Sequence, residues 1–157
     1  VSAASDVLQS LSAHLSVQTV GPDKVNQLRH ARFLSGRIAE HMEQHATILR
    51  PKFALVDRML SEQLGALDIA SWTQPNGGYF ISLDVLPGLA QKVVAMAKTA
   101  GLVLTPAGAT FPYGIDPEDR NVRIAPTFGS LSELQGAMQI LTLCVKLASA
   151  RHLLAQG

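Results

Sequence analysis

The sequence predicts an α+β fold, a small mixed sheet of about three strands flanked by helices. Two observations lead to this prediction. Apolar residues recur at three- and four-residue steps through most of residues 4–64 and again after residue 130, a spacing typical of amphipathic helices. Between these stretches the apolar period falls to two, most clearly in residues 79–84, which is typical of a strand with one buried face.

Three helical stretches are expected before residue 65, namely residues 4–15, 24–34 and 38–64. The last of these carries the longest apolar stripe in the chain, and Pro51 lies inside it. Proline lacks the N–H of a helical hydrogen bond and its ring clashes with the preceding turn. We therefore expect either two consecutive helices or one helix that bends at residues 49–52.

The remaining residues alternate between strand and helix patterns. Short strands are expected at residues 71–73, 79–84, 102–105 and 121–125. A helix over residues 89–100 should end at Gly101, where a left-handed conformation is needed. The last helix should begin after Ser130, with Glu133 completing a capping box, and reach about Leu154.

Composition excludes several classes of protein. Thirteen Lys and Arg against twelve Asp and Glu leave a net charge of +1, too little for a dedicated nucleic-acid binder. The apolar runs are far shorter than the ~20 residues of a membrane-spanning helix, and the first 23 residues contain no Lys or Arg for a signal peptide. We therefore expect a cytoplasmic protein that binds neither nucleic acid nor membrane.

A metal centre is not expected either. His41 and His45 share one face of a helix, but Met42 stands where a zinc-protease helix would need Glu as its base. The single cysteine, Cys144, excludes a cysteine-cluster zinc site and an internal disulfide. Its place in an apolar helix predicts a small buried side chain rather than a nucleophile.

Arg123 is the most informative residue of the sequence. In the short strand around it, Val122 and Ile124 face one way and Arg123 faces the other. A guanidinium in such a strand loses hydration free energy unless it meets an anion. Two kinds of anion remain open, a structural Asp or Glu of this chain and a carboxylate substrate held by two parallel hydrogen bonds.

Five segments in this order resemble the C-terminal part of a fold-type-I, pyridoxal-phosphate-dependent aminotransferase. The resemblance is greatest to the class I group of aspartate-aminotransferase-like, or MocR-like, enzymes. The segments are GPDKVNQLRHARFL (21–34), LRPKFALVDRMLSEQL (49–64), SWTQPNGGYFISLDVLPG (71–88), GLVLTPAGATFPYGIDPEDRNVRIAPTF (101–128) and the helix that begins ELQGAM (133–138). Together they span nearly the whole chain.

The resemblance implies roles for particular residues. Arg123 would bind the α-carboxylate of the substrate, and the pocket would be lined by Tyr79 or Phe80, which follow Gly78. The segment at residues 105–111 resembles a Pro-x-Gly loop that lies near the active site in the family.

The segment around residue 24 resembles a stretch that reaches the active site of the partner subunit. The residues implied there are Lys24, Asn26 and Gln27. We accordingly expect a homodimer when the protein is complete.

The resemblance also implies a domain organisation. Residues 1–36 would end the large domain, residues 37–65 would form the bent interdomain helix, and residues 66–157 would form the small C-terminal α+β domain. In the family, the lysine that holds pyridoxal phosphate lies on the large domain, upstream of these residues. We therefore expect this chain to bind no covalent cofactor and to be inactive alone.

The complete enzyme would use an amino acid and a 2-oxo acid as substrates. An alternative of a different class is a non-enzymatic α+β interaction module, in which Arg123 would have a structural role.

Overall fold

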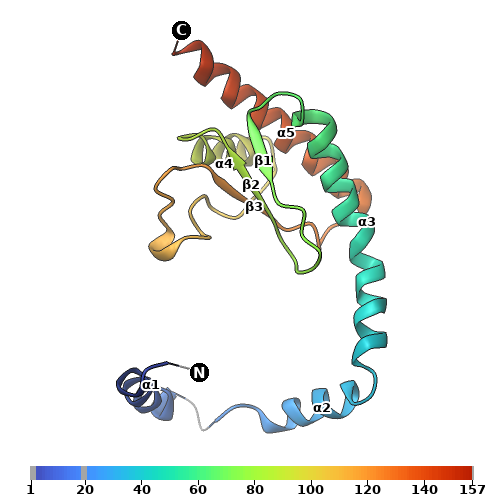
Figure 1. Ribbon diagram of the computed structural model, residues 1–157, viewed down its shortest axis with the longest axis vertical. Helices are drawn as coiled ribbons and strands as arrows, with labels where there is room; N and C mark the ends of the chain where they lie inside the picture. The colour runs from blue at the N-terminus through green and yellow to red at the C-terminus, as the bar shows by residue number, and fades with distance from the viewer. Residues whose placement is uncertain (1–2, 19–20, 157) are drawn as a thin grey trace. The chain divides into compact units, whose positions relative to one another are not determined.

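The computed structural model of the chain describes residues 3–18 and 21–156. Its elements are, in order, α1 (Ser5–Gln18), α2 (Lys24–Leu34), α3 (Ile38–Leu64), β1 (Ala70–Trp72), β2 (Ile81–Val85), α4 (Ala90–Thr99), the 3₁₀ helix η1 (Pro112–Gly114), β3 (Asn121–Ile124) and α5 (Leu131–Leu154) (Figure 1). The α+β class expected from the sequence is confirmed, because helices flank a three-stranded sheet.

The chain divides into two compact units, an N-terminal unit of residues 1–45 and a C-terminal unit of residues 46–157. In the N-terminal unit, the Asp23 side chain caps α2 by accepting a hydrogen bond from the Asn26 N–H at 2.9 Å. The helix ends at Ser35, as the sequence indicates. No residue of α1 or α2 is buried within the described structure.

Helix α3 runs without interruption from Ile38 to Leu64 with Pro51 inside it. Of the two alternatives drawn from the sequence, two consecutive helices are therefore wrong and a single helix is confirmed. The buried face of α3 begins only after the proline, and it comprises Leu55, Val56, Met59, Leu60 and Leu64. Packing of this face stabilises the helix beyond what its local propensity provides.

The sheet has the strand order β1-β2-β3, and both strand pairs are antiparallel. The expectation of a mixed sheet is thus wrong in this detail. A helix between two strands suggests a parallel crossover, but here α4 is followed by a long segment, residues 100–120, that reverses the chain before β3. The Val85 N–H donates to the Arg120 carbonyl at 2.9 Å, where this segment returns to β2.

The strand expected at residues 102–105 does not form. Leu102 and Leu104 are half-buried, while Val103 between them is 80% exposed, so the alternation is present without a neighbouring strand to pair with. Strand β2 also begins at Ile81 rather than Tyr79, and the aromatic pair at residues 79 and 80 precedes it.

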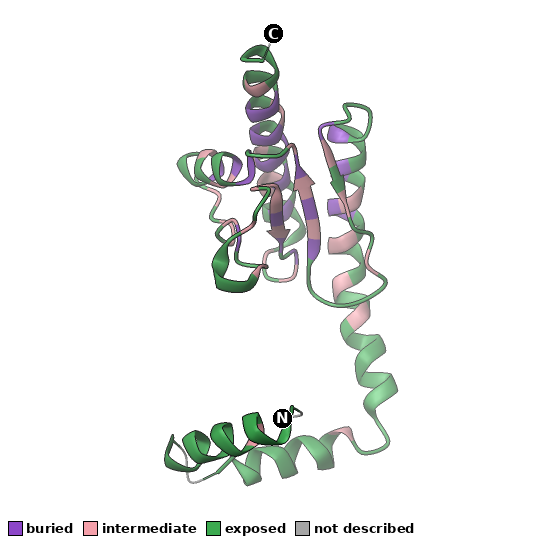
Figure 2. Ribbon diagram, turned by 60° about the vertical axis from the view of Figure 1, so that its left-hand side comes forward, coloured by how far each residue is buried: buried purple, intermediate pink, exposed green. Residues whose placement is uncertain are grey.

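One apolar core joins the second half of α3, helices α4 and α5, and the inward residues of the sheet (Figure 2). Ile81, Leu83 and Val85 of β2 are buried in it, and so are Val122 and Ile124 of β3. Because side chains alternate along a strand, the intervening residues of β2 and β3 face away from this core.

The ends of the last two helices agree with the sequence. Gly101 follows α4 with a φ of +91°, and Ser130 and Glu133 form a capping box at the start of α5.

No helix of the described ranges is long and apolar enough to cross a membrane.

Candidate functional site

The outward face of strands β2 and β3 carries the polar residues of the sheet. Val122 and Ile124 lie in the core, so Asn121 and Arg123 face the other way, as the alternation predicted. The antiparallel register places Ser82 opposite Arg123 and Asp84 opposite Asn121. A guanidinium, an amide, a hydroxyl and a carboxylate thus share one side of two neighbouring strands.

The guanidinium of Arg123 has few partners for a half-buried cation. Its Nη2 donates a long hydrogen bond, 3.3 Å, to the Thr105 hydroxyl. Its Cζ lies 4.5 Å from the centroid of the Phe80 ring, and its Nε is buried without a hydrogen-bond partner. Within residues 3–18 and 21–156 it forms no ion pair with a carboxylate.

A small cavity of about 160 Å³ adjoins this arginine. The segment 102–105, the end of β3 and the first half of α5 line it, mostly with apolar side chains such as Leu104, Leu134 and Met138. Arg123 is the one charged residue among the described residues that line it. An apolar wall lowers the local dielectric, which strengthens the attraction between the guanidinium and any carboxylate that reaches it.

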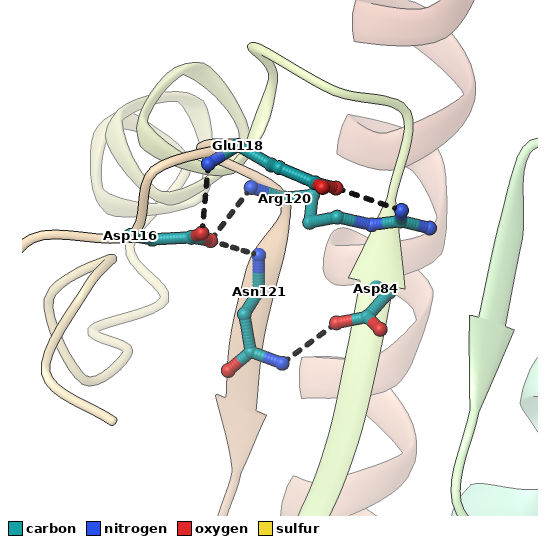
Figure 3. A network of polar contacts seen from close by, with 5 residues as sticks. All are labelled: Asp84, Asp116, Glu118, Arg120 and Asn121. Atoms are coloured by element: carbon teal, nitrogen blue, oxygen red, sulfur yellow. Dashed lines mark hydrogen bonds and ion pairs between the residues drawn. The ribbon is translucent and has the colours of Figure 1, made fainter. Parts of the chain in front are cut away.

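A hydrogen-bonded network around Asn121 connects the same two strands, and Figure 3 shows its contact with Asp84. The Asn121 Nδ2 donates to the Asp84 carboxylate at 2.7 Å and to the Ser82 hydroxyl at 2.8 Å. Its Oδ1 accepts from the Thr110 hydroxyl at 2.8 Å. Asn121 therefore joins the loop around residue 110 to both strands, two residues before Arg123.

Asp116 closes the turn that leads into β3 (Figure 3). Its carboxylate accepts the backbone N–H of Glu118 at 3.1 Å, and those of Arg120 and Asn121 at 2.8 Å each. Desolvation alone would raise the pKa of Asp116, but these backbone donors outweigh it and lower the pKa. In the same turn, the hydrogen bond to Glu118 raises the pKa of the Arg120 guanidinium.

Of the residues expected around the pocket, the structure brings Phe80 to Arg123. Gly78 adopts a φ of +91°, the left-handed conformation that favours glycine, and starts the turn into β2. Tyr79 is 52% exposed and Phe80 is 49% exposed. The aromatic pair is therefore open to solvent on one side.

The residues expected near a partner subunit belong to the N-terminal unit. Lys24, Asn26 and Gln27 occupy the first turn of α2, and their side chains are exposed. The Gln27 N–H donates to the Asp23 carbonyl at 3.1 Å, so the backbone of this turn is fixed and the side chains are presented outward.

The remaining candidates do not gather into a site. Among the described residues, no three His, Cys, Asp or Glu side chains are placed to hold a metal ion. Cys144 is buried in α5, where desolvation raises the pKa of its thiol. A thiol with a raised pKa is a poor nucleophile at neutral pH.

One site residue, Asn121, was missed in the sequence, whereas Thr105 belongs to the segment 105–111 that the resemblance placed near the active site. A signal was present for Asn121, since it lies two positions before Arg123 on the same face of a strand. The sequence did not indicate that the Thr105 hydroxyl would contact Arg123, because that contact depends on the folding of the segment between residues 102 and 111.

The structure defines a small α+β domain with a half-buried arginine on the outward face of its sheet, and the sequence places the chain in a family. All 157 residues match the family described as aspartate amino-transferase, so the chain belongs to that family.

Individual relatives agree with this assignment. A Mycolicibacterium smegmatis protein named as an aminotransferase is 51% identical over 143 residues, which is 90% of this chain and 33% of that protein. The chain thus spans about a third of the length of the curated relatives it matches.

Solved structures show the same similarity. A crystal structure of an aspartate transaminase from Corynebacterium glutamicum is 44% identical, with a TM-score of 0.82 over 90% of this chain and 34% of that one. An α-aminoadipate aminotransferase from Thermus thermophilus, complexed with N-(5'-phosphopyridoxyl)-L-leucine, shares the fold at 18% identity, with a TM-score of 0.74 over 92% of this chain and 36% of that one.

Proposed function

We propose that this chain is the C-terminal part of a pyridoxal-phosphate-dependent aminotransferase that exchanges an amino group between an amino acid of the aspartate type and a 2-oxo acid. Arg123 binds the α-carboxylate of the substrate. The surroundings of its guanidinium support this role, because the half-buried cation lacks a carboxylate partner among the described residues and its Nε has no acceptor. A guanidinium in this state favours an external anion.

The chemistry of the two substrate classes also supports a single arginine as the binding group for both of them. An amino acid and a 2-oxo acid differ at the reacting carbon but carry the same carboxylate next to it. A planar guanidinium binds a carboxylate through two parallel hydrogen bonds, which fix its orientation as well as its position. Arg123 therefore orients both substrates alike, so that the reacting carbon occupies one place in both half-reactions.

The described residues fit a substrate carboxylate and do not fit the cofactor. No lysine lines the cavity beside Arg123. The amine of Lys52 donates to the Thr127 carbonyl and that of Lys146 to the Gln63 amide, at 2.7 Å each. When bound to the complete enzyme, pyridoxal phosphate supplies the electron sink for chemistry at the α-carbon, and we assign its contacts to residues outside this chain.

The proposal also includes that the complete enzyme is a homodimer. The first turn of α2 presents Lys24, Asn26 and Gln27 to solvent from a capped and hydrogen-bonded backbone. These polar side chains are suited to reach a polar site on a second subunit.

Substitution of Arg123 in the full-length enzyme tests the proposal. A charge-assisted hydrogen bond contributes about 1.5–3 kcal/mol. Arg123→Lys keeps the charge and loses the two-pronged geometry, so kcat/KM should fall at least about tenfold. Arg123→Gln should lower it further, and the melting temperature should stay within a few degrees of the wild type.

The opposite result would favour the interaction module. If Arg123 were only structural, its replacement would remove its contacts with Thr105 and Phe80, and stability would fall by about 1–3 kcal/mol while the kinetics stayed unchanged. Wild-type kinetics in Arg123→Gln together with a strongly lowered melting temperature would refute the carboxylate-binding role.

A further inference from the structure

The guanidinium of Arg123 touches two side chains of the described structure, and neither is an acid. The Phe80 ring lies against it, with 4.5 Å between Cζ and the ring centroid. The Thr105 hydroxyl accepts one long hydrogen bond from Nη2. Neither contact neutralises the positive charge, but both restrict where the guanidinium can lie.

The strand register explains why Phe80 reaches Arg123. Ser82 is directly opposite Arg123 in the β2–β3 pair. Phe80 stands two residues before Ser82 and directly before β2, so the alternation of the strand, continued by one residue, places it diagonal to the arginine. Diagonal neighbours across an antiparallel pair are about 7–8 Å apart at their backbones, which aromatic and long side chains span.

The ring and the hydroxyl leave different parts of the guanidinium available. A cation is attracted to the electron-rich face of an aromatic ring, and the Cζ of Arg123 lies over the Phe80 ring. The N–H donors of a guanidinium lie in its plane and point outward from its edge. Thr105 takes one donor of Nη2, and the ring takes none, so most of the edge stays free for a carboxylate.

Holding the cation in this way matters because an arginine side chain is flexible. Ordering a long side chain costs conformational free energy, and the cost is among the largest for arginine. If the guanidinium is already oriented before the substrate arrives, the substrate carboxylate does not have to provide that free energy. An acid in place of the ring would also orient the cation, but it would compete with the substrate.

We propose that Phe80 is a positioning residue that orients the guanidinium of Arg123 for the substrate carboxylate, with Thr105 as its second support. This inference rests on the proposed function, since it assigns Phe80 a role only through Arg123. The proposal gives the two aromatic residues before β2 different roles, because it is the ring of Phe80 that lies against the guanidinium of Arg123. An aromatic face is therefore required at position 80. Tyrosine and tryptophan supply such a face, and leucine supplies only similar bulk.

The experiment uses the full-length enzyme and the non-reacting dicarboxylate succinate as the probe of carboxylate binding. Phe80→Leu should raise the Kd of succinate, measured by calorimetry, by about 2- to 30-fold, the range of a cation–π contact at exposed to desolvated sites. In steady-state kinetics KM should rise with kcat nearly unchanged, because binding is weakened equally before and in the transition state. Phe80→Tyr should restore both constants.

A double-mutant cycle with Arg123→Gln shows whether Phe80 acts through the arginine. In that neutral background, Phe80→Leu should change the Kd less than twofold, because no cation remains to be oriented. Phe128→Leu is the matched control, since Phe128 is 100% exposed in the same unit. This variant should bind succinate with the Kd of the wild type.

The outcomes are distinct. An equal loss from Phe80→Leu in both backgrounds, or no loss in either, overturns the positioning role while Arg123 keeps its own. An unchanged Kd in Arg123→Gln overturns the proposed carboxylate site itself, and with it the role of Phe80.

Discussion

Asn121→Ala should be among the most damaging single changes near the site, because one amide joins three segments. Its side chain makes three hydrogen bonds, to Ser82, Asp84 and Thr110, at 2.7–2.8 Å. A neutral hydrogen bond contributes about 0.5–1.5 kcal/mol and one to a charged group about 1.5–3 kcal/mol. Because the network is partly exposed and water can replace some of these bonds, we expect a total loss near the lower end, about 2–3 kcal/mol.

Urea unfolding of the chain, followed by far-ultraviolet circular dichroism, measures this loss. Asn76→Ala serves as the control, since Asn76 is exposed in a turn and should change the free energy of unfolding by less than about 0.5 kcal/mol. Thr110→Val, which removes one of the three bonds, should cost about 0.5–1.5 kcal/mol. A loss below about 0.5 kcal/mol in Asn121→Ala would refute the view that this amide fastens the loop to the sheet.

Two further predictions concern the same loop. Gly108 has a φ of +85°, and a Cβ there would collide with the Gly114 carbonyl. Gly108→Ala should therefore lower the free energy of unfolding by at least about 1–2 kcal/mol in urea melts. Gly136→Ala in the second turn of α5, where a Cβ meets no atom within 4 Å, should raise it slightly. Equal effects of the two substitutions would contradict the collision. The folded state lowers the pKa of Asp116, so the unfolded chain binds more protons as that carboxyl titrates. Its stabilisation is complete above the unfolded pKa of about 3.9 and is lost as pH falls through the folded pKa, so Asp116→Asn should flatten the stability profile below about pH 5. Parallel plots of unfolding free energy against pH for the wild type and Asp116→Asn would contradict this role of the Asp116 carboxylate.

Several features of the fold follow from local sequence, and the structure confirms them. The capping box at Ser130 and the left-handed Gly101 depend only on residues within one helical turn. The alternation in β3 depends on successive side chains pointing to opposite faces, so the outward position of Arg123 could be predicted.

Other features depended on distant contacts and were not predictable. The segment 102–105 has a strand-like pattern but no strand beside it, and a strand requires a hydrogen-bonded neighbour. The sequence around Pro51 allowed either two helices or one bent helix, and the choice between them depended on packing, because the face of α3 after the proline lies in the core.

The sequence by itself determined that an arginine faces away from the core of a small α+β domain, and its segments indicated the aminotransferase family. Only the tertiary structure decided what meets that arginine. Phe80 and Thr105 come from separate segments, and the antiparallel register and the path of residues 102–111 bring them to Arg123. Side-chain periodicity is a local property of the backbone, whereas the partners of a side chain are set by the pairing of strands that are distant along the chain.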